Sequence, residues 1–143
     1  MNARPAAIGV GIITVLLGLA ALLYPERTLG VLGLAVQNAA HTAAALGEVR
    51  ATYGGCFLVL GIYTVLGAAS PYTHRSRLTM LGLVWLGSAA GRLLGVSMDG
   101  NPGLFGWIGV VFELAMGTTL VVAAVSATPP AAASGPAVPV TSS

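Results

Sequence analysis

Charged residues are scarce in this sequence. Six arginines and four acidic residues make up 7% of the 143 residues, whereas a soluble domain carries about 25%. Apolar residues account for 56% of the chain, which is more apolar surface than a folded body of this size hides from water. The composition therefore excludes an ordinary soluble protein and predicts a protein that lies in lipid.

Cysteine, histidine and clustered basic residues are also lacking. The single cysteine, Cys56, excludes an internal disulfide and any Cys-based zinc or iron–sulfur site. His41 and His74 are expected on opposite faces of the membrane, so we predict no metal site and no cofactor. The basic residues are scattered rather than gathered in a stripe, which argues against a nucleic-acid partner.

The usual enzyme motifs are absent as well. The sequence has no HExxH, no GxSxG and no phosphate-binding glycine loop. Ser88 would need a base to act as a nucleophile, and no histidine is placed to provide one. An enzyme is therefore not the favoured interpretation.

Long apolar runs are what the sequence does contain. Four of them reach the length of about 20 residues that a membrane-spanning helix needs. We expect these helices at about residues 6–24, 48–69, 78–96 and 104–125. The predicted fold class is all-α, an integral membrane bundle of four transmembrane helices that forms one domain over residues 1–125.

The connections between the predicted helices differ in kind. Residues 70–77 and 99–103 are short and rich in turn-forming residues. The apolar link at 25–47 predicts an interfacial or re-entrant segment between the first two helices. The Pro/Ala/Ser-rich residues 126–143 predict a disordered tail.

Arginines in the loops and flanks suggest an orientation. The face of the predicted bundle that holds both termini carries three of them, namely Arg4, Arg75 and Arg77. The loops of the other face carry Arg27 alone, so the positive-inside rule places both termini in the cytoplasm. The count becomes equal if Arg50 and Arg92, at helix ends on that other face, are included.

The remaining charged residues are expected to converge at the non-cytoplasmic end of the bundle. Glu113 lies about 13 Å into the fourth helix at 1.5 Å per residue, and a carboxylate at that depth costs about 2.5 to 3.5 kcal/mol unless it is protonated, paired or hydrated. Arg92 is the natural partner for either Glu113 or Asp99. The cluster is interpreted either as a structural ion pair or as a ligand or proton site. Its predicted members are Glu48, Arg50, Tyr53, Arg92, Asp99 and Glu113.

Small residues recur four positions apart in three of the predicted helices. This spacing lets helices approach closely in a membrane. The glycines expected to pack helices together are Gly54, Gly55, Gly87, Gly91, Gly95, Gly109 and Gly117.

Several of these motifs together resemble a known family. RATYGG at 50–55, GRLLG at 91–95, Asp99-Gly100-Asn101-Pro102 and Glu113 are similar to the DUF4345 family, as is the Tyr24-Pro25-Glu26 exit from the first helix. That family comprises small four-helix bacterial membrane proteins of unknown function. The resemblance covers about residues 16 to 122 and implies a location in the bacterial inner membrane. It also supports treating the polar cluster as one site, and it implies no activity.

Four functions remain open from the sequence, the fourth being an intramembrane enzyme in which paired acids beside a tyrosine transfer a proton at a lipid. The favoured hypothesis is a protein that binds a lipid or another amphiphile, with its polar head at Arg50 and Arg92. The second is an accessory or structural subunit of a larger membrane complex, assembled through the small-residue faces. The third is a proton-coupled carrier in which Glu113 titrates and a homo-oligomer supplies alternating access. The expected partners are accordingly the bilayer, a bound amphiphile, and a second copy or a larger complex.

Overall fold

The computed structural model describes residues 3–36 and 41–129, and every regular element within them is helical. The elements in chain order are α1 (Arg4–Leu23), α2 (Pro25–Val31), α3 (Thr42–Val49), η2 (Arg50–Cys56), α4 (Phe57–Ala69), α5 (Arg75–Asp99) and α6 (Gly103–Val125). The described part of the chain has no strand, which confirms the all-α class.

Four long helices dominate the fold, as expected. They are α1, the continuous helix Thr42–Ala69, α5 and α6, and each is long and apolar enough to cross a membrane. This length and composition support a membrane protein. The continuous helix is formed by α3, η2 and α4, and its η2 segment is a π-helix with the sequence RATYGGC.

Two helices extend beyond their predicted bounds. The second long helix begins at Thr42 rather than at about residue 48, and α5 runs three residues further at each end than 78–96. The expected bounds followed the apolar runs, but polar residues such as Arg75, Arg77 and Asp99 are compatible with helical backbone. The change in polarity thus marks the end of an apolar run, not the end of the helix.

The long helices pack as two close pairs. In the first pair, α1 lies against η2 and α4. A Cβ atom at Gly18 would lie 2.5 Å from the Leu58 backbone nitrogen, and one at Gly61 would lie 2.5 Å from the Val15 backbone nitrogen. Glycine is required at both positions because the obstructing atoms belong to the backbone of the facing helix.

The second pair consists of α5 and α6. A Cβ atom at Gly82 would lie 2.9 Å from the Gly117 carbonyl oxygen, and one at Gly117 would lie 2.8 Å from the Gly82 oxygen. The two helices therefore touch backbone to backbone at this level.

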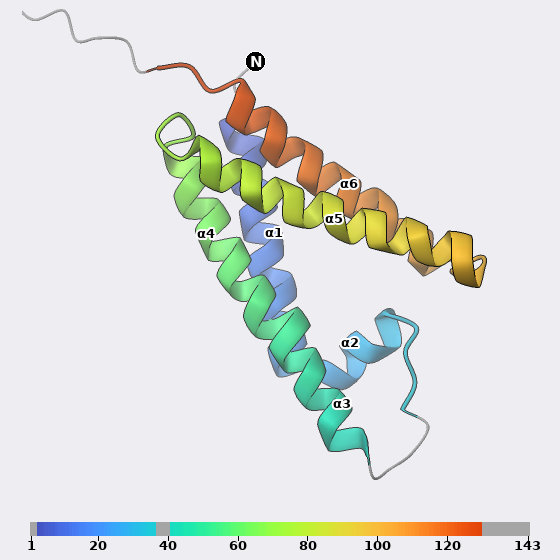
Figure 1. Cartoon of the computed structure of the whole chain (residues 1–143). Coiled ribbons are helices and arrows are strands. Elements are labelled where there is room, and N and C mark those ends of the chain that lie inside the picture. The colour runs from blue at the N-terminus through green and yellow to red at the C-terminus, as the bar shows by residue number, and fades with distance from the viewer. Residues whose placement is uncertain (1–2, 37–40, 130–143) are drawn as a thin grey trace, which may run out of the picture.

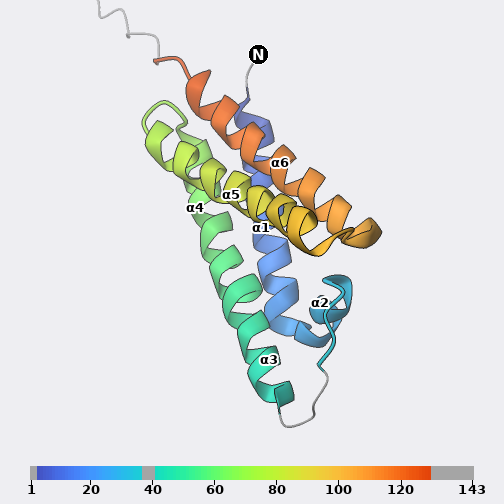
Figure 2. The same ribbon diagram turned by 45° about the vertical axis from the view of Figure 1, so that its right-hand side comes forward.

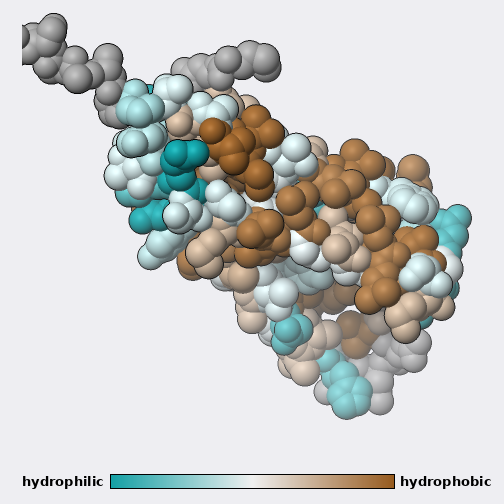
Figure 3. All heavy atoms as spheres, turned by 45° about the horizontal axis from the view of Figure 1, so that its top comes forward, coloured by the Kyte–Doolittle hydropathy of each residue, from teal (hydrophilic) through white to brown (hydrophobic). Residues whose placement is uncertain are grey.

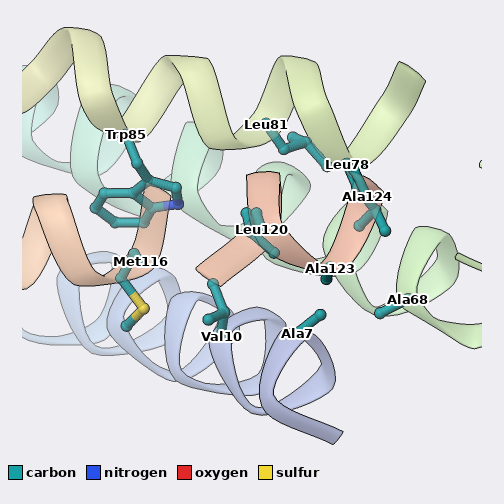
Figure 4. Close-up of a cluster of buried hydrophobic side chains, with 10 residues drawn as sticks. All are labelled: Ala7, Val10, Ala68, Leu78, Leu81, Trp85, Met116, Leu120, Ala123 and Ala124. Carbon is teal, nitrogen blue, oxygen red and sulfur yellow. The ribbon is translucent and has the colours of Figure 1, made fainter. Parts of the chain in front are cut away.

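The two pairs are joined at one end of the molecule. Figure 4 shows side chains from α1, α4, α5 and α6 meeting in one buried cluster. Its members are Ala7, Val10, Ala68, Leu78, Leu81, Trp85, Met116, Leu120, Ala123 and Ala124. Toward their other ends the pairs diverge, and α2 lies near the end of α1 there (Figures 1 and 2). The core thus holds the two pairs together at one end of the bundle. At the opposite end, α3 and the Asp99 end of α5 lie apart (Figures 1 and 2).

The outer surface is apolar, and several polar side chains lie inside. Figure 3 shows hydrophobic residues covering the face over α5 and α6, with hydrophilic residues gathered near the α4–α5 hairpin. Thr14 and Thr64 are buried, and each hydroxyl donates to the carbonyl oxygen four residues earlier at 2.8 Å. This distribution of apolar and polar side chains is the reverse of that in a soluble domain and agrees with an apolar surrounding.

The link between the first two long helices contains a short helix, α2. Pro25 occupies its first turn, where a missing N–H costs nothing, and Gly33 in the following turn has a φ of 71°. Residues 37–40 of the expected interfacial or re-entrant segment lie outside the described residues. Of the tail predicted at 126–143, residues 130–143 likewise lie outside them.

Candidate functional site

One carboxylate is buried between α5 and α6. The side chain of Glu113, on α6, is only 5% exposed. Its Oε1 accepts a hydrogen bond from Arg92 Nε at 2.8 Å and another from Ser88 Oγ at 2.8 Å, both donors lying on α5. The ion pair predicted from the sequence therefore forms with Glu113 rather than with Asp99.

The local sequence explains why these groups meet. Ser88 and Arg92 are four residues apart, so they share one face of α5 and both reach the same carboxylate oxygen. On α6, Gly109 lies one turn before Glu113, and a Cβ atom there would lie 3.3 Å from Arg92 Cζ. The guanidinium thus lies across the glycine, in space that a larger residue would fill.

The two charged side chains differ in what they leave unpaired. Glu113 Oε2 is buried and has no hydrogen-bond partner among the described residues. Arg92 is 36% exposed, and within the described chain only its Nε forms a hydrogen bond. The site therefore holds a cation by its inner nitrogen and leaves both outer nitrogens available to an acceptor.

A row of aromatic rings leads from η2 to this site. Tyr53 and Phe57 have ring centroids 5.8 Å apart, Phe57 and Trp85 are 5.3 Å apart, and Trp85 and Phe112 are 5.6 Å apart, all edge to face. Trp85 lies one turn before Ser88 on α5, and Phe112 directly precedes Glu113. The rings thus connect both helix pairs beside the carboxylate, and Tyr53 joins the site through them rather than by direct contact.

Three of the six expected cluster residues lie elsewhere. Glu48 is exposed and its Oε1 accepts a hydrogen bond from Thr52 Oγ1 at 2.8 Å, while Arg50 and Asp99 are exposed. None of the three forms a hydrogen bond or ion pair with Arg92 or Glu113 in the part of the chain that the structure describes. Glu48 and Arg50 are separated from the ion pair because the two helix pairs diverge toward that end (Figure 1), whereas Asp99 lies about two turns beyond Arg92 on the same helix.

Comparison with protein families identifies one match. The family described as "Domain of unknown function (DUF4345)" matches residues 3–124. The chain belongs to the DUF4345 family. The match extends over all four long helices and includes the buried pair. No curated protein and no solved structure matches the chain.

The glycines of this DUF4345 chain have several different neighbours. Gly54 packs on Leu22 of α1, Gly117 packs on Gly82 and Leu86, and Gly109 accommodates the Arg92 guanidinium. The others in the expected packing set meet no neighbouring helix among the described residues. Gly87 and Gly91 face open space, and the nearest atoms to Gly55 and Gly95 belong to Arg50 and Asp99 of their own helices.

Sequence reasoning missed two residues of the α5–α6 contact. Ser88 was considered only as a nucleophile, although its spacing of four from Arg92 placed both on one helix face. Gly82, which makes the backbone contact, precedes the glycine series that begins at Gly87 and lies outside its four-residue spacing. The four-residue spacing of Ser88 and Arg92 is thus a signal that the sequence contains. The role of Gly82 in helix packing, in contrast, is evident only from its contact with Gly117 in the structure.

Two open pockets of the described chain lie away from the buried pair. One, of about 640 Å³, is at the end with the α4–α5 hairpin, between Arg4, Tyr72 and Thr128. Another, of about 320 Å³, is an apolar groove between α1 and α4. No group of three or more potential metal ligands occurs within residues 3–36 and 41–129.

Proposed function

We propose that this chain is an integral membrane protein that binds an amphiphile with an anionic head at Arg92. The observation that carries the proposal is an arginine held through Nε by a buried carboxylate, with its outer nitrogens free of other protein partners in the described chain. A guanidinium in this state offers two parallel donors to a carboxylate or phosphate. Glu113 then acts as a positioning residue that fixes the direction of the fork.

The surroundings of Arg92 suit an acyl chain. Met80 and Val84 continue the four-residue row of Ser88 and Arg92 along α5 and both are exposed, and no side chain lies against Gly87 or Gly91. A hydrocarbon tail would therefore find an apolar strip along α5 that leads away from the guanidinium.

We further propose a location in the bacterial inner membrane with both termini in the cytoplasm. Arg4, Arg75 and Arg77 belong to the same end of the helix bundle, where Arg75 Nε donates to the Ala124 carbonyl oxygen at 3.1 Å. An excess of arginine at one end is typical of the cytoplasmic side.

The proposal is tested by the amphiphiles that co-purify with the protein. We expect native mass spectrometry and extraction to detect an anionic amphiphile on the wild type and on Glu113→Gln, which keeps the cation. The double variant Arg92→Gln/Glu113→Gln should lose it, because the donors are gone and no lone buried charge remains to unfold the chain.

Arg77→Gln is the matched control. Arg77 lies on the same helix as Arg92 but near its other end, stacked 5.4 Å from the Tyr63 ring. This variant should retain the bound amphiphile. An unchanged amphiphile profile in the double variant would contradict the proposed function.

A second function, as a subunit of a homo-oligomer or larger membrane complex, is favoured by one observation. Gly87 and Gly91 form a small-residue face on α5 without a neighbour among the described residues, and such faces pack helices in membranes. Sizing after mild detergent extraction separates the two functions, because a stable monomer that carries amphiphile supports the first and argues against the second.

A further inference from the structure

We propose that the amphiphile is a weak acid, a long-chain carboxylic acid, that gives its proton to Glu113 as its carboxylate binds Arg92. The inference rests on the proposed function and names the class of ligand. It follows from the charge balance of the site and from the buried Glu113 oxygen that has no partner in the described chain.

The charge balance distinguishes weak acids from permanent anions. Arg92 and Glu113 form a neutral pair, 2.8 Å apart. A permanent anion bound at Arg92 would leave one uncompensated negative charge in an apolar surrounding, which is costly. A carboxylic acid enters neutral and brings the compensating proton with it. Afterwards Arg92 is paired with the ligand carboxylate, Glu113 is a neutral acid, and the site has no net charge.

The proton transfer is balanced and needs no other reactant. The O–H bond of the ligand breaks, its electron pair stays on the ligand carboxylate, and the proton forms an O–H bond on Glu113. Oε1 already accepts two hydrogen bonds, from Arg92 and Ser88, and a neutral carboxyl group can keep both through its carbonyl oxygen. The proton is therefore assigned to Oε2. A buried neutral hydroxyl at this atom costs less free energy than a buried carboxylate oxygen that carries part of the negative charge and has no hydrogen-bond donor.

Within residues 3–36 and 41–129, no charged group other than Arg92 contacts Glu113 to take the proton in its place. Glu113 lies on α6, whose packing neighbours are chiefly α5 and α1, and α6 has no other Asp, Glu, His or Arg. Tyr53 is separated from it by the rings of Phe57, Trp85 and Phe112. The other charged residues of α5, which are Arg75, Arg77 and Asp99, and the one of α1, Arg4, lie at or near the helix ends. Those of α2, which are Glu26 and Arg27, are exposed.

The experiment measures binding of radiolabelled oleate to the purified full chain in lipid nanodiscs between about pH 6 and pH 8. In the wild type, binding of the oleate anion takes up one proton, whereas Glu113→Gln binds the anion alone. The ratio of wild-type to Glu113→Gln affinity should therefore fall about tenfold per pH unit. Ionisation of oleate itself affects both proteins equally and cancels in this ratio.

A competitor of fixed charge supplies a second measurement that does not depend on the variant. Hexadecanesulfonate carries no proton at these pH values, so it should displace oleate from the wild type at least tenfold less effectively than unlabelled palmitate does. On Glu113→Gln the two competitors should be nearly equal. A constant affinity ratio across the pH range, or equal competition on the wild type, would overturn the inference.

The outcomes also separate this inference from the proposed function. Saturable oleate binding that disappears in Arg92→Gln/Glu113→Gln but does not distinguish sulfonate from carboxylate would remove only the weak-acid inference. Oleate binding that never exceeds that of the double variant at any pH would contradict the binding site at Arg92 itself.

Discussion

Removing Arg92 should destabilise the fold more than removing Glu113. The Glu113 side chain is 5% exposed, and Arg92→Ala removes its ion-pair partner and leaves Ser88 as its hydrogen-bond donor among the described residues. In Glu113→Ala, the charge left behind belongs to a side chain that is already 36% exposed and can extend toward headgroups or water. The asymmetry follows from the burial of one partner and not the other.

The magnitudes follow from the same contacts. An orphaned buried partner of an ion pair costs about 3 to 5 kcal/mol, and we place Arg92→Ala at the lower end, about 3 kcal/mol, because the Ser88 hydroxyl still donates to Glu113. Glu113→Ala removes two hydrogen bonds but leaves no buried charge, so we expect about 1 to 2 kcal/mol. The double alanine variant should cost about 2 kcal/mol less than the sum of the single changes.

The assay is equilibrium unfolding in mixed micelles, with Trp85 as the reporter. Trp85 is 4% exposed and lies in the ring row beside the site, whereas Trp107 is 42% exposed, so a Trp107→Phe background isolates the buried signal. Additive free energies of unfolding for the two single changes would refute the reasoning, since they would mean that the ion pair contributes no coupling.

Two further predictions concern the helix contacts. Gly18→Ala places a Cβ atom 2.5 Å from the Leu58 backbone nitrogen and should lower the free energy of unfolding by about 1 to 3 kcal/mol in the same assay. Gly9→Ala, on the same helix, meets open space and should be neutral or stabilising by up to about 1 kcal/mol. Equal effects of the two changes would contradict the α1–α4 contact. Arg75→Gln removes the hydrogen bond to the Ala124 carbonyl oxygen and should lower the free energy of unfolding by about 1 kcal/mol. Amide hydrogen exchange in the last turn of α6 should become faster, and unchanged exchange there would argue against this contact.

The sequence was sufficient for the long helices because apolar runs of about 20 residues have few alternatives. It did not determine where those helices end. Arg75 begins α5 three residues before the apolar run starts, and hydropathy carries no information about such polar turns. The π-helical segment at Arg50–Cys56 was also not predicted, because an i→i+5 hydrogen-bond pattern leaves no hydropathy signature.

The buried pair was predictable in part. The depth of Glu113 in an apolar helix identified it as a residue that needs a partner, and Arg92 was the nearest cation on the neighbouring helix. The wider cluster assumed parallel helices, which would place Arg50 and Asp99 at the same end as the pair. In the structure the helix pairs diverge there (Figure 2), which separates Arg50 of η2 from α5 and α6, whereas Asp99 is exposed at the end of α5 beyond Arg92.

The two glycines that flank Glu113 explain why Arg92 is held and yet accessible. At Gly117 the missing Cβ lets α6 touch the backbone of α5 at Gly82, so the helices are closest there. One turn before Glu113, the missing Cβ of Gly109 instead leaves space that the Arg92 guanidinium occupies. The interface therefore changes within two turns from backbone contact to side-chain contact, and Glu113 lies at the transition. Its carboxylate is buried by the first contact and directs the guanidinium into the second, and this is why one end of the ion pair is enclosed while the other faces the apolar strip along α5.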